Sequence, residues 1–169
     1  MKIVNIFWEK LDFDQDQIRK LNSKTDYGVY QIYGRHNAYG KDALLYIGQS
    51  CGQTFAQRLH QRWEFTESCA IPYTLRIGKI VKSNNAEDPQ DWPYKDRWNE
   101  MISNCERLLL HTHAPAFNKQ CNSGLYDISN EINNIHIFNW GDFGDLLPEI
   151  SVYRYSFKYW SYETPLAVD

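Results

Sequence analysis

The sequence predicts an α+β fold, in which a small mixed β-sheet, made of a β-hairpin and a third strand, is flanked by helices. The hairpin is predicted because residues 27–33 and 43–48 are rich in aromatic and β-branched residues, and the polar, glycine-bearing residues 34–42 separate them. The helices are predicted because apolar residues recur at helical spacing in residues 53–65 and 94–113. We expect N- and C-terminal decorations around this core.

Alternation along the two strands of the hairpin is expected to bring two phenols together. It puts Tyr30 and Ile32 on one face of the first strand. In the second strand, Tyr46 shares a face with Leu44 and Gly48. Each phenol has a polar tip that must find water, a partner or a substrate. By itself, the pattern is equally typical of two tyrosines that only pack.

The other elements are predicted from shorter patterns. Residues 75–81 form the third strand, which we expect at the centre of the sheet together with the hairpin. Residues 2–8 indicate a short strand and residues 14–22 a helix. Residues 83–93 are polar and predict an inserted loop, whereas residues 151–162 alternate well enough for a strand.

The amphipathic helix over residues 53–65 carries two arginines. Arg58 and Arg62 are four positions apart, so they share one face of the helix, and His60 points elsewhere. A solvated surface is the ordinary explanation for such a pair. The alternative is a site that binds an anion.

The longest helical pattern covers residues 94–113, and Glu106 stands out in it. The apolar stripe consists of Trp98, Met101, Ile102, Cys105, Leu108 and Leu109. Glu106 lies in the apolar half of this helix, and a glutamate near a buried face is uncommon unless it is paired or binds a metal. The helix ends before Pro115, and Asn118 follows on the exit segment.

Together these elements resemble the GIY-YIG nuclease superfamily over roughly residues 26–120. The residues that carry the resemblance are Gly28-Val29-Tyr30, Tyr46-Ile47-Gly48, Arg58, Glu106 and Asn118. Their order, types and spacings all fit that family. The chain departs from the pattern at Arg62, where many members carry a histidine one helical turn after the arginine. The first motif has Val29 at its middle position, where the family motif has an isoleucine; this is a minor change, because the two side chains are similar in shape.

The resemblance implies metal-dependent hydrolysis of DNA phosphodiester bonds. Glu106 would hold a single divalent cation, Mg²⁺ or Mn²⁺. Tyr30 would be the general base, and Arg58 would lower its pKa and stabilise the charge of the transition state. Tyr46 would orient the water or the phosphate. Asn118 would hydrogen-bond the phosphate or a neighbouring group.

Three further residues are secondary candidates: Arg62, Lys41 on the hairpin loop, and His60. An arginine stays charged and cannot accept a proton, so Arg62 would only lower the pKa of the base or bind the transition state. The missing histidine leaves an alternative function open. In that alternative, the chain is a catalytically silent GIY-YIG-fold module that binds DNA or protein and regulates a partner.

The resemblance divides the 169 residues into three parts: an N-terminal extension at 1–25, the nuclease-like core at 26–120, and an acidic, aromatic-rich C-terminal extension packed on the core at 121–169. The net charge of −3 comes mainly from the C-terminal extension. Because DNA-binding domains are usually basic, a near-neutral core predicts modest affinity for DNA that depends on a few placed cations.

Composition predicts the setting of the protein. No run of about 18 apolar residues and no signal-peptide pattern occur, so we expect a cytoplasmic protein without a membrane span. The four cysteines lack metal-binding spacing, which favours reduced thiols over a zinc site. The aromatic residues of 121–169 would pack on the sheet, stack bases or build a homodimer interface. With no room for a separate DNA-binding domain, a stand-alone restriction or mobile-element enzyme is favoured.

Overall fold

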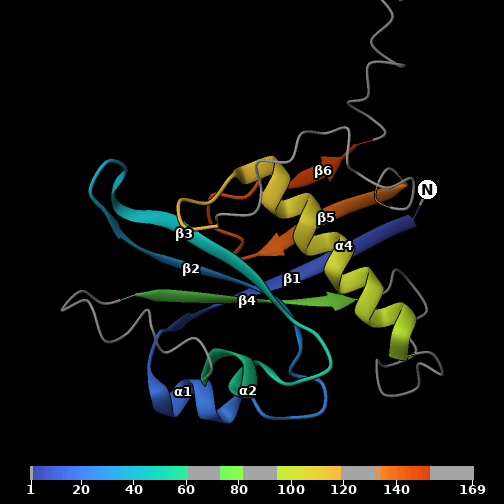
Figure 1. Ribbon diagram of the computed structural model, residues 1–169, viewed down its shortest axis with the longest axis horizontal. Helices are drawn as coiled ribbons and strands as arrows, with labels where there is room; N and C mark the ends of the chain where they lie inside the picture. The colour runs from blue at the N-terminus through green and yellow to red at the C-terminus, as the bar shows by residue number, and fades with distance from the viewer. Residues whose placement is uncertain (1, 61–72, 82–94, 119–131, 133, 153–169) are drawn as a thin grey trace, which may run out of the picture.

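The computed structural model describes residues 2–60, 73–81, 95–118, 132 and 134–152, which form one mixed β-sheet with helices packed on it (Figure 1). The strands are β1 (Lys2–Asp12), β2 (Gly28–His36), β3 (Gly40–Ser50), β4 (Thr74–Val81), β5 (Ile135–Gly141) and β6 (Glu149–Ser151). The helices are α1 (Gln15–Lys20), α2 (Phe55–His60) and α4 (Lys95–His113). The predicted α+β class is confirmed. No described helix is long and apolar enough to cross a membrane.

The sheet is larger than the sequence predicts. Its strands lie in the order β3-β2-β4-β1-β5-β6, and neighbours are antiparallel except for β1 and β5. The predicted hairpin is β2 and β3, and the predicted third strand is β4. The central position expected for the hairpin is wrong for β3, because β1, β5 and β6 extend the sheet only on the β4 side and leave β3 at the edge. β1 is an interior strand of the same sheet.

The hairpin turn is also tighter than predicted. The sequence predicts a loop over residues 34–42, but β2 runs to His36, which pairs with Gly40 of β3. Gly40 and Asp42 adopt φ values of +87° and 53°. Residues in this left-handed region close short hairpin turns, so the chain reverses within a few residues.

A β-bulge interrupts the alternation of β3. Ile32 pairs with Tyr46, but the next residue of β2, Tyr33, pairs with Leu44, so Leu45 is the extra residue. Leu44 therefore packs with the core under α4, whereas Tyr46 packs with the core on the opposite face. The prediction that Leu44 and Tyr46 share a face is wrong for this reason.

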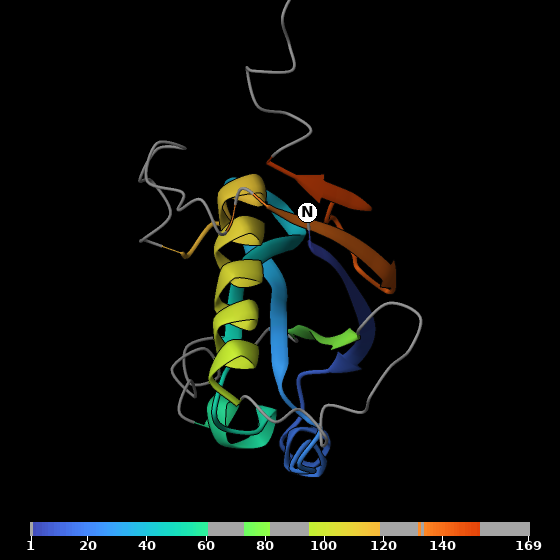
Figure 2. The same ribbon diagram turned by 90° about the vertical axis from the view of Figure 1, so that its right-hand side faces the viewer.

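The two faces of the sheet carry separate apolar cores. Under α4, Val29, Ile47 and the predicted stripe of the helix pack with residues of β1 and β5. On the opposite face, α1 and α2 cover a second cluster: Ile18, Tyr30, Ile32, Phe55, Leu59, Leu75 and Ile77. Figure 1 shows α1 and α2 side by side and apart from α4, and Figure 2 shows them at the lower end of the curled sheet. The candidate tyrosines thus lie in the smaller core.

Candidate active site

The structure brings the two predicted phenols together. The rings of Tyr30 and Tyr46 are stacked, with centroids 6.0 Å apart and an interplanar angle of 29°. Tyr30 is completely buried and Tyr46 is half-buried. One phenol is therefore shielded from water, while its neighbour lies between the core and the surface.

Gly48 makes this arrangement possible. It is the cross-strand partner of Tyr30. A Cβ atom at position 48 would lie 2.5 Å from Cζ and Oη of Tyr30 and 2.7 Å from Cε1 of Tyr46. Any side chain at position 48 would displace both rings. The close packing of the two tyrosines therefore requires a glycine at this position of the second motif. In the sequence, Gly48 stands out only as part of a motif, although a glycine directly opposite a tyrosine in a predicted hairpin indicates such close packing.

Helix α2 holds its arginine beside this core. Its start is a capping box, since the backbone N–H of Gln57 donates to Thr54 Oγ1 at 3.3 Å and the N–H of Thr54 donates to Gln57 Oε1 at 3.0 Å. Phe55 and Leu59 of the helix pack with Tyr30. The described helix covers only the first part of the predicted range 53–65.

Arg58 is partly withdrawn from water. Its side chain is half-buried, and its Nε is buried without an acceptor among the described residues. It forms no ion pair with any residue in the described part of the chain. A guanidinium is a planar donor that matches the oxygens of a phosphate, so Arg58 is a candidate for binding an anion of this kind.

Glu106 lies on the side of α4 that faces β3. One turn earlier on that side, the hydroxyl of Ser103 donates to Oε1 of Gln49 in β3 at 2.8 Å. Burial raises the pKa of the Cys51 thiol at the end of β3, and the charge of Glu106 adds to that rise. Glu106 is half-buried. The Ser103–Gln49 contact, which sequence analysis missed, fixes the helix that carries the carboxylate; a polar residue on the helix-facing side of a strand was its only signal.

Asn118 binds the outer edge of β3. Its Nδ2 donates to the carbonyl of Ile47 at 2.8 Å, and its Oδ1 accepts from the N–H of Ile47 at 2.9 Å. Just before it, the N–H of Phe117 donates to the carbonyl of Leu45 at 2.8 Å. The exit segment of α4 therefore continues the hydrogen bonding of the sheet beside Tyr46. The phosphate contact of Asn118 stays a prediction; its Nδ2 carries a second N–H, which could donate to a phosphate while both bonds to Ile47 are kept.

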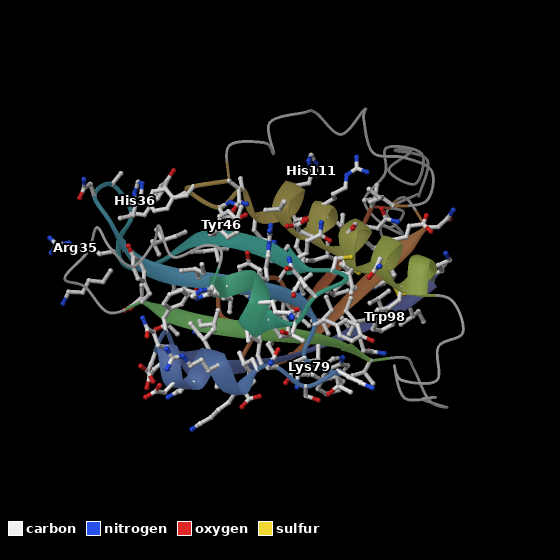
Figure 3. All side chains as sticks on the ribbon, turned by 60° about the horizontal axis from the view of Figure 1, so that its bottom comes forward. Arg35, His36, Tyr46, Lys79, Trp98 and His111 are labelled. Carbon is white, nitrogen blue, oxygen red and sulfur yellow. The ribbon has the colours of Figure 1, made fainter. Side chains whose placement is uncertain are left out.

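Two of the three secondary candidates are exposed. Lys41 is exposed at the hairpin tip, and His60 is exposed at the end of α2. Arg62 falls outside the described residues. Figure 3 shows Tyr46 on β3, between α2 and the His111 end of α4 in this view.

The side chains available as metal ligands determine which ion the candidate site would bind. Among the described residues, no group of three or more His, Cys, Asp or Glu side chains is placed to hold a metal ion. Glu106 would then be the main protein ligand. One carboxylate with several water molecules and a substrate phosphate is the coordination that Mg²⁺ favours, so the residues fit a hard divalent ion of this kind.

Known proteins give no match to this chain: no family model, no curated protein and no solved structure matches it. The resemblance to the GIY-YIG family therefore depends on the residues that carry it and on their geometry.

Proposed function

We propose that the chain is a divalent-metal-dependent endodeoxyribonuclease similar to GIY-YIG nucleases. The observation that carries this proposal is the stack of Tyr30 and Tyr46 over Gly48, next to a helix whose Arg58 lacks an ion-pair partner among the described residues. Phosphodiester hydrolysis needs a base that takes a proton from the attacking water and a cation that stabilises the negative charge developing on the phosphate oxygens. Tyrosine and arginine supply these two functions.

Tyr30 is the proposed general base. A free phenol titrates near pH ~10, and burial disfavours its charged form. A nearby cation lowers the pKa of a phenol, so Arg58 would favour the phenolate form of Tyr30. Tyr46, which is less buried, would direct its hydroxyl to the water or to the phosphate.

Glu106 is the proposed metal ligand. A bound Mg²⁺ or Mn²⁺ would neutralise charge on the phosphate and on the leaving oxygen. Ser103 and Gln49 would keep the carboxylate in place by fixing α4 against β3. Asn118 would position the edge of β3 next to Tyr46.

We extend the proposal to a cytoplasmic enzyme that acts on DNA in a restriction or mobile-element setting. A homodimer would present two such sites to a duplex and cut both strands, whereas a monomer would nick one strand. The products of a supercoiled plasmid distinguish these possibilities, because nicked circles and linear molecules separate on a gel.

Cleavage of supercoiled plasmid DNA with Mg²⁺, and its loss with EDTA, tests the proposed function. Glu106→Gln should lower the rate by a factor on the order of 10² or more, since it removes the metal ligand but keeps the shape. Glu100→Gln is the matched control, because Glu100 is exposed on the same helix. Near-wild-type cleavage by Glu106→Gln would end the metal-ligand assignment. DNA binding without any cleavage by the wild type would favour the silent binding module instead.

A further inference from the structure

The β2–β3 hairpin ends in a stack of aromatic rings. His36 and Tyr39 have ring centroids 4.6 Å apart at an interplanar angle of 25°. The ring of Phe117, from the exit segment of α4, packs against His36 at a tilt of 54°, with the two ring centroids 5.6 Å apart. Tyr39 is 72 % exposed and Phe117 is 42 % exposed. Three contiguous rings at the surface form a larger apolar feature than the single exposed residues that are normal in proteins.

Backbone hydrogen bonds hold this stack in place. Nδ1 of His36 accepts from the N–H groups of Ala38 at 3.2 Å and of Tyr39 at 3.3 Å. The left-handed φ of Gly40 then returns the chain into β3. The exposed face of Tyr39 is thus presented in a fixed orientation, so a planar ligand can stack on it at little cost in conformational entropy.

Two cations flank the stack. Arg35 precedes His36, and Lys41 follows Gly40; both side chains are exposed. Asp42 is the only acidic residue in the segment 35–42. Figure 3 shows Arg35 and His36 at the tip of the hairpin, which projects from the body of the molecule. Cations beside an aromatic surface are the combination with which proteins bind single-stranded nucleic acid.

The stack is continuous with the candidate active site. Phe117 is hydrogen-bonded to Leu45, and Asn118 is hydrogen-bonded to Ile47, so the exit segment runs along β3 past Tyr46. Tyr39 and Tyr46 are seven residues apart, which corresponds to about 20 Å along a strand. With a spacing of about 3.4 Å per nucleotide, this is about six nucleotides.

We propose that the Tyr39–His36–Phe117 stack binds an unpaired nucleobase of the DNA substrate, about six nucleotides from the phosphate at Tyr46. Arg35 and Lys41 contact the phosphates next to that base. This site rests on the proposed function and names its substrate class: DNA with a gap, flap or other unpaired position. A base in an intact duplex has no free face, so only an unpaired base gains the stacking contact.

A binding experiment without metal tests this site independently of cleavage. The full chain is titrated in EDTA with two fluorescent duplexes of the same sequence, one intact and one with a short gap that carries 2-aminopurine, whose emission is quenched on stacking. We expect the wild type to bind the gapped DNA about tenfold more tightly and to quench the probe. Tyr39→Ala should lose both effects, whereas Tyr39→Phe, which keeps the ring, should retain them.

Equal binding of the two duplexes by the wild type would overturn the site, as would unchanged quenching with Tyr39→Ala. Loss of DNA binding with Tyr39→Phe would also contradict it, because stacking needs only the ring. Glu106→Gln separates this result from the proposed function. That variant should keep the preference for gapped DNA and lose cleavage, so failure of the stacking site and failure of the catalytic site give different results.

Discussion

Strand β2 contributes a tyrosine to each face of the sheet. Arg76 lies over the ring of Tyr33 on one face, and Arg58 belongs to helix α2, which packs on Tyr30, on the other. On the α4 face, the hydroxyl of Tyr33 donates to Oε1 of Gln31 at 2.8 Å and accepts from the N–H of Asp145 at 2.9 Å. The guanidinium carbon of Arg76 lies 4.2 Å from the centroid of the Tyr33 ring. Burial raises the pKa of Tyr33 above its usual value near 10.0. Its hydroxyl is therefore used within the protein.

The α2 face has the same residue types in a different arrangement. Tyr30 stacks on a second phenol, and Gly48 leaves room for both rings. Neither Arg58 nor Arg76 forms an ion pair with the described residues, and the Nε of each is buried without a partner among them; Arg76 in addition lies over the ring of Tyr33. Tyrosine and arginine in proximity do not identify a reactive site. The two faces differ in what engages each phenol: Gln31, Asp145 and Arg76 contact Tyr33, whereas Tyr30 stacks on Tyr46, the arrangement that we propose as catalytic.

Replacing each arginine should have opposite consequences, and this is the largest effect we expect. Arg58→Ala should lower the single-turnover cleavage rate by a factor on the order of 10², with little change in stability because no ion pair with the described residues is lost. Arg76→Ala should keep the rate and lower the free energy of unfolding by about 1 kcal/mol through loss of its contact with Tyr33. Cleavage kinetics and denaturant unfolding measure both. Wild-type cleavage by Arg58→Ala would remove the distinction between the two faces.

Two glycines permit a second comparison, with a smaller effect. Gly48→Ala should cost about 1–3 kcal/mol of stability by overpacking and should also slow cleavage, because it displaces Tyr30 and Tyr46. In Gly78→Ala, the new Cβ would lie 2.8 Å from Cγ2 of Ile6 and 2.8 Å from Cζ3 of Trp8, in the core under α4. A similar loss of stability should follow without loss of rate per folded molecule. Equal slowing in both variants would mean that rate follows stability alone.

The smallest effect concerns His113, another polar side chain used within the protein. Its Nε2 accepts from the N–H of Leu147 at 2.9 Å and its Nδ1 lies 2.9 Å from the carbonyl of Leu109, to which it must donate. Burial lowers the pKa of His113, and the bond to Leu109 partly offsets this. Because the folded-state pKa is depressed, the contribution of His113 to stability is present above about pH 6.5 and is lost as the pH falls below it.

We therefore expect the Tm of the wild type to fall between about pH 7 and pH 5 by a few degrees more than that of His113→Gln. His60→Gln is the control, since His60 is exposed. Thermal unfolding followed by circular dichroism gives the three profiles. Parallel profiles for wild type and His113→Gln would show that the imidazole does not couple α4 to the β5–β6 connection.

The elements that the sequence predicts are those with a clear local pattern of apolar residues. The β2–β3 hairpin, β4 and α4 follow from periodicity, and α4 begins at Lys95 and ends at His113 within one residue of the predicted range. The parallel pairing of β1 with β5 joins residues such as Asn5 and Phe138, which are far apart in sequence, so no local signal indicates it. The bulge at Leu45 is likewise not indicated by the local sequence, because it places Leu44 and Tyr46 in the two cores on opposite faces of the sheet.

The candidate site was predictable to the same extent. The contact of Tyr30 with Tyr46 follows from strand register, because the two strands are neighbours in sequence and space. The bonds of Asn118 to Ile47 link a side chain to a backbone 71 positions away, and composition does not indicate them. The burial of the Nε of Arg58 without an acceptor among the described residues is a property of the folded chain that no sequence pattern indicates.

The two tyrosines of β2 provide the most direct measurement. Single-turnover cleavage and equilibrium unfolding are compared for Tyr30→Phe and Tyr33→Phe, which remove one hydroxyl each from opposite faces of one strand. We expect Tyr30→Phe to lower the rate by a factor on the order of 10² with little change in stability. Tyr33→Phe should keep the rate and lose about 1–3 kcal/mol, because Gln31 and Asp145 lose their partner. If Tyr30→Phe keeps the rate and loses only stability, Tyr30 is a core residue and the proposed active site is wrong.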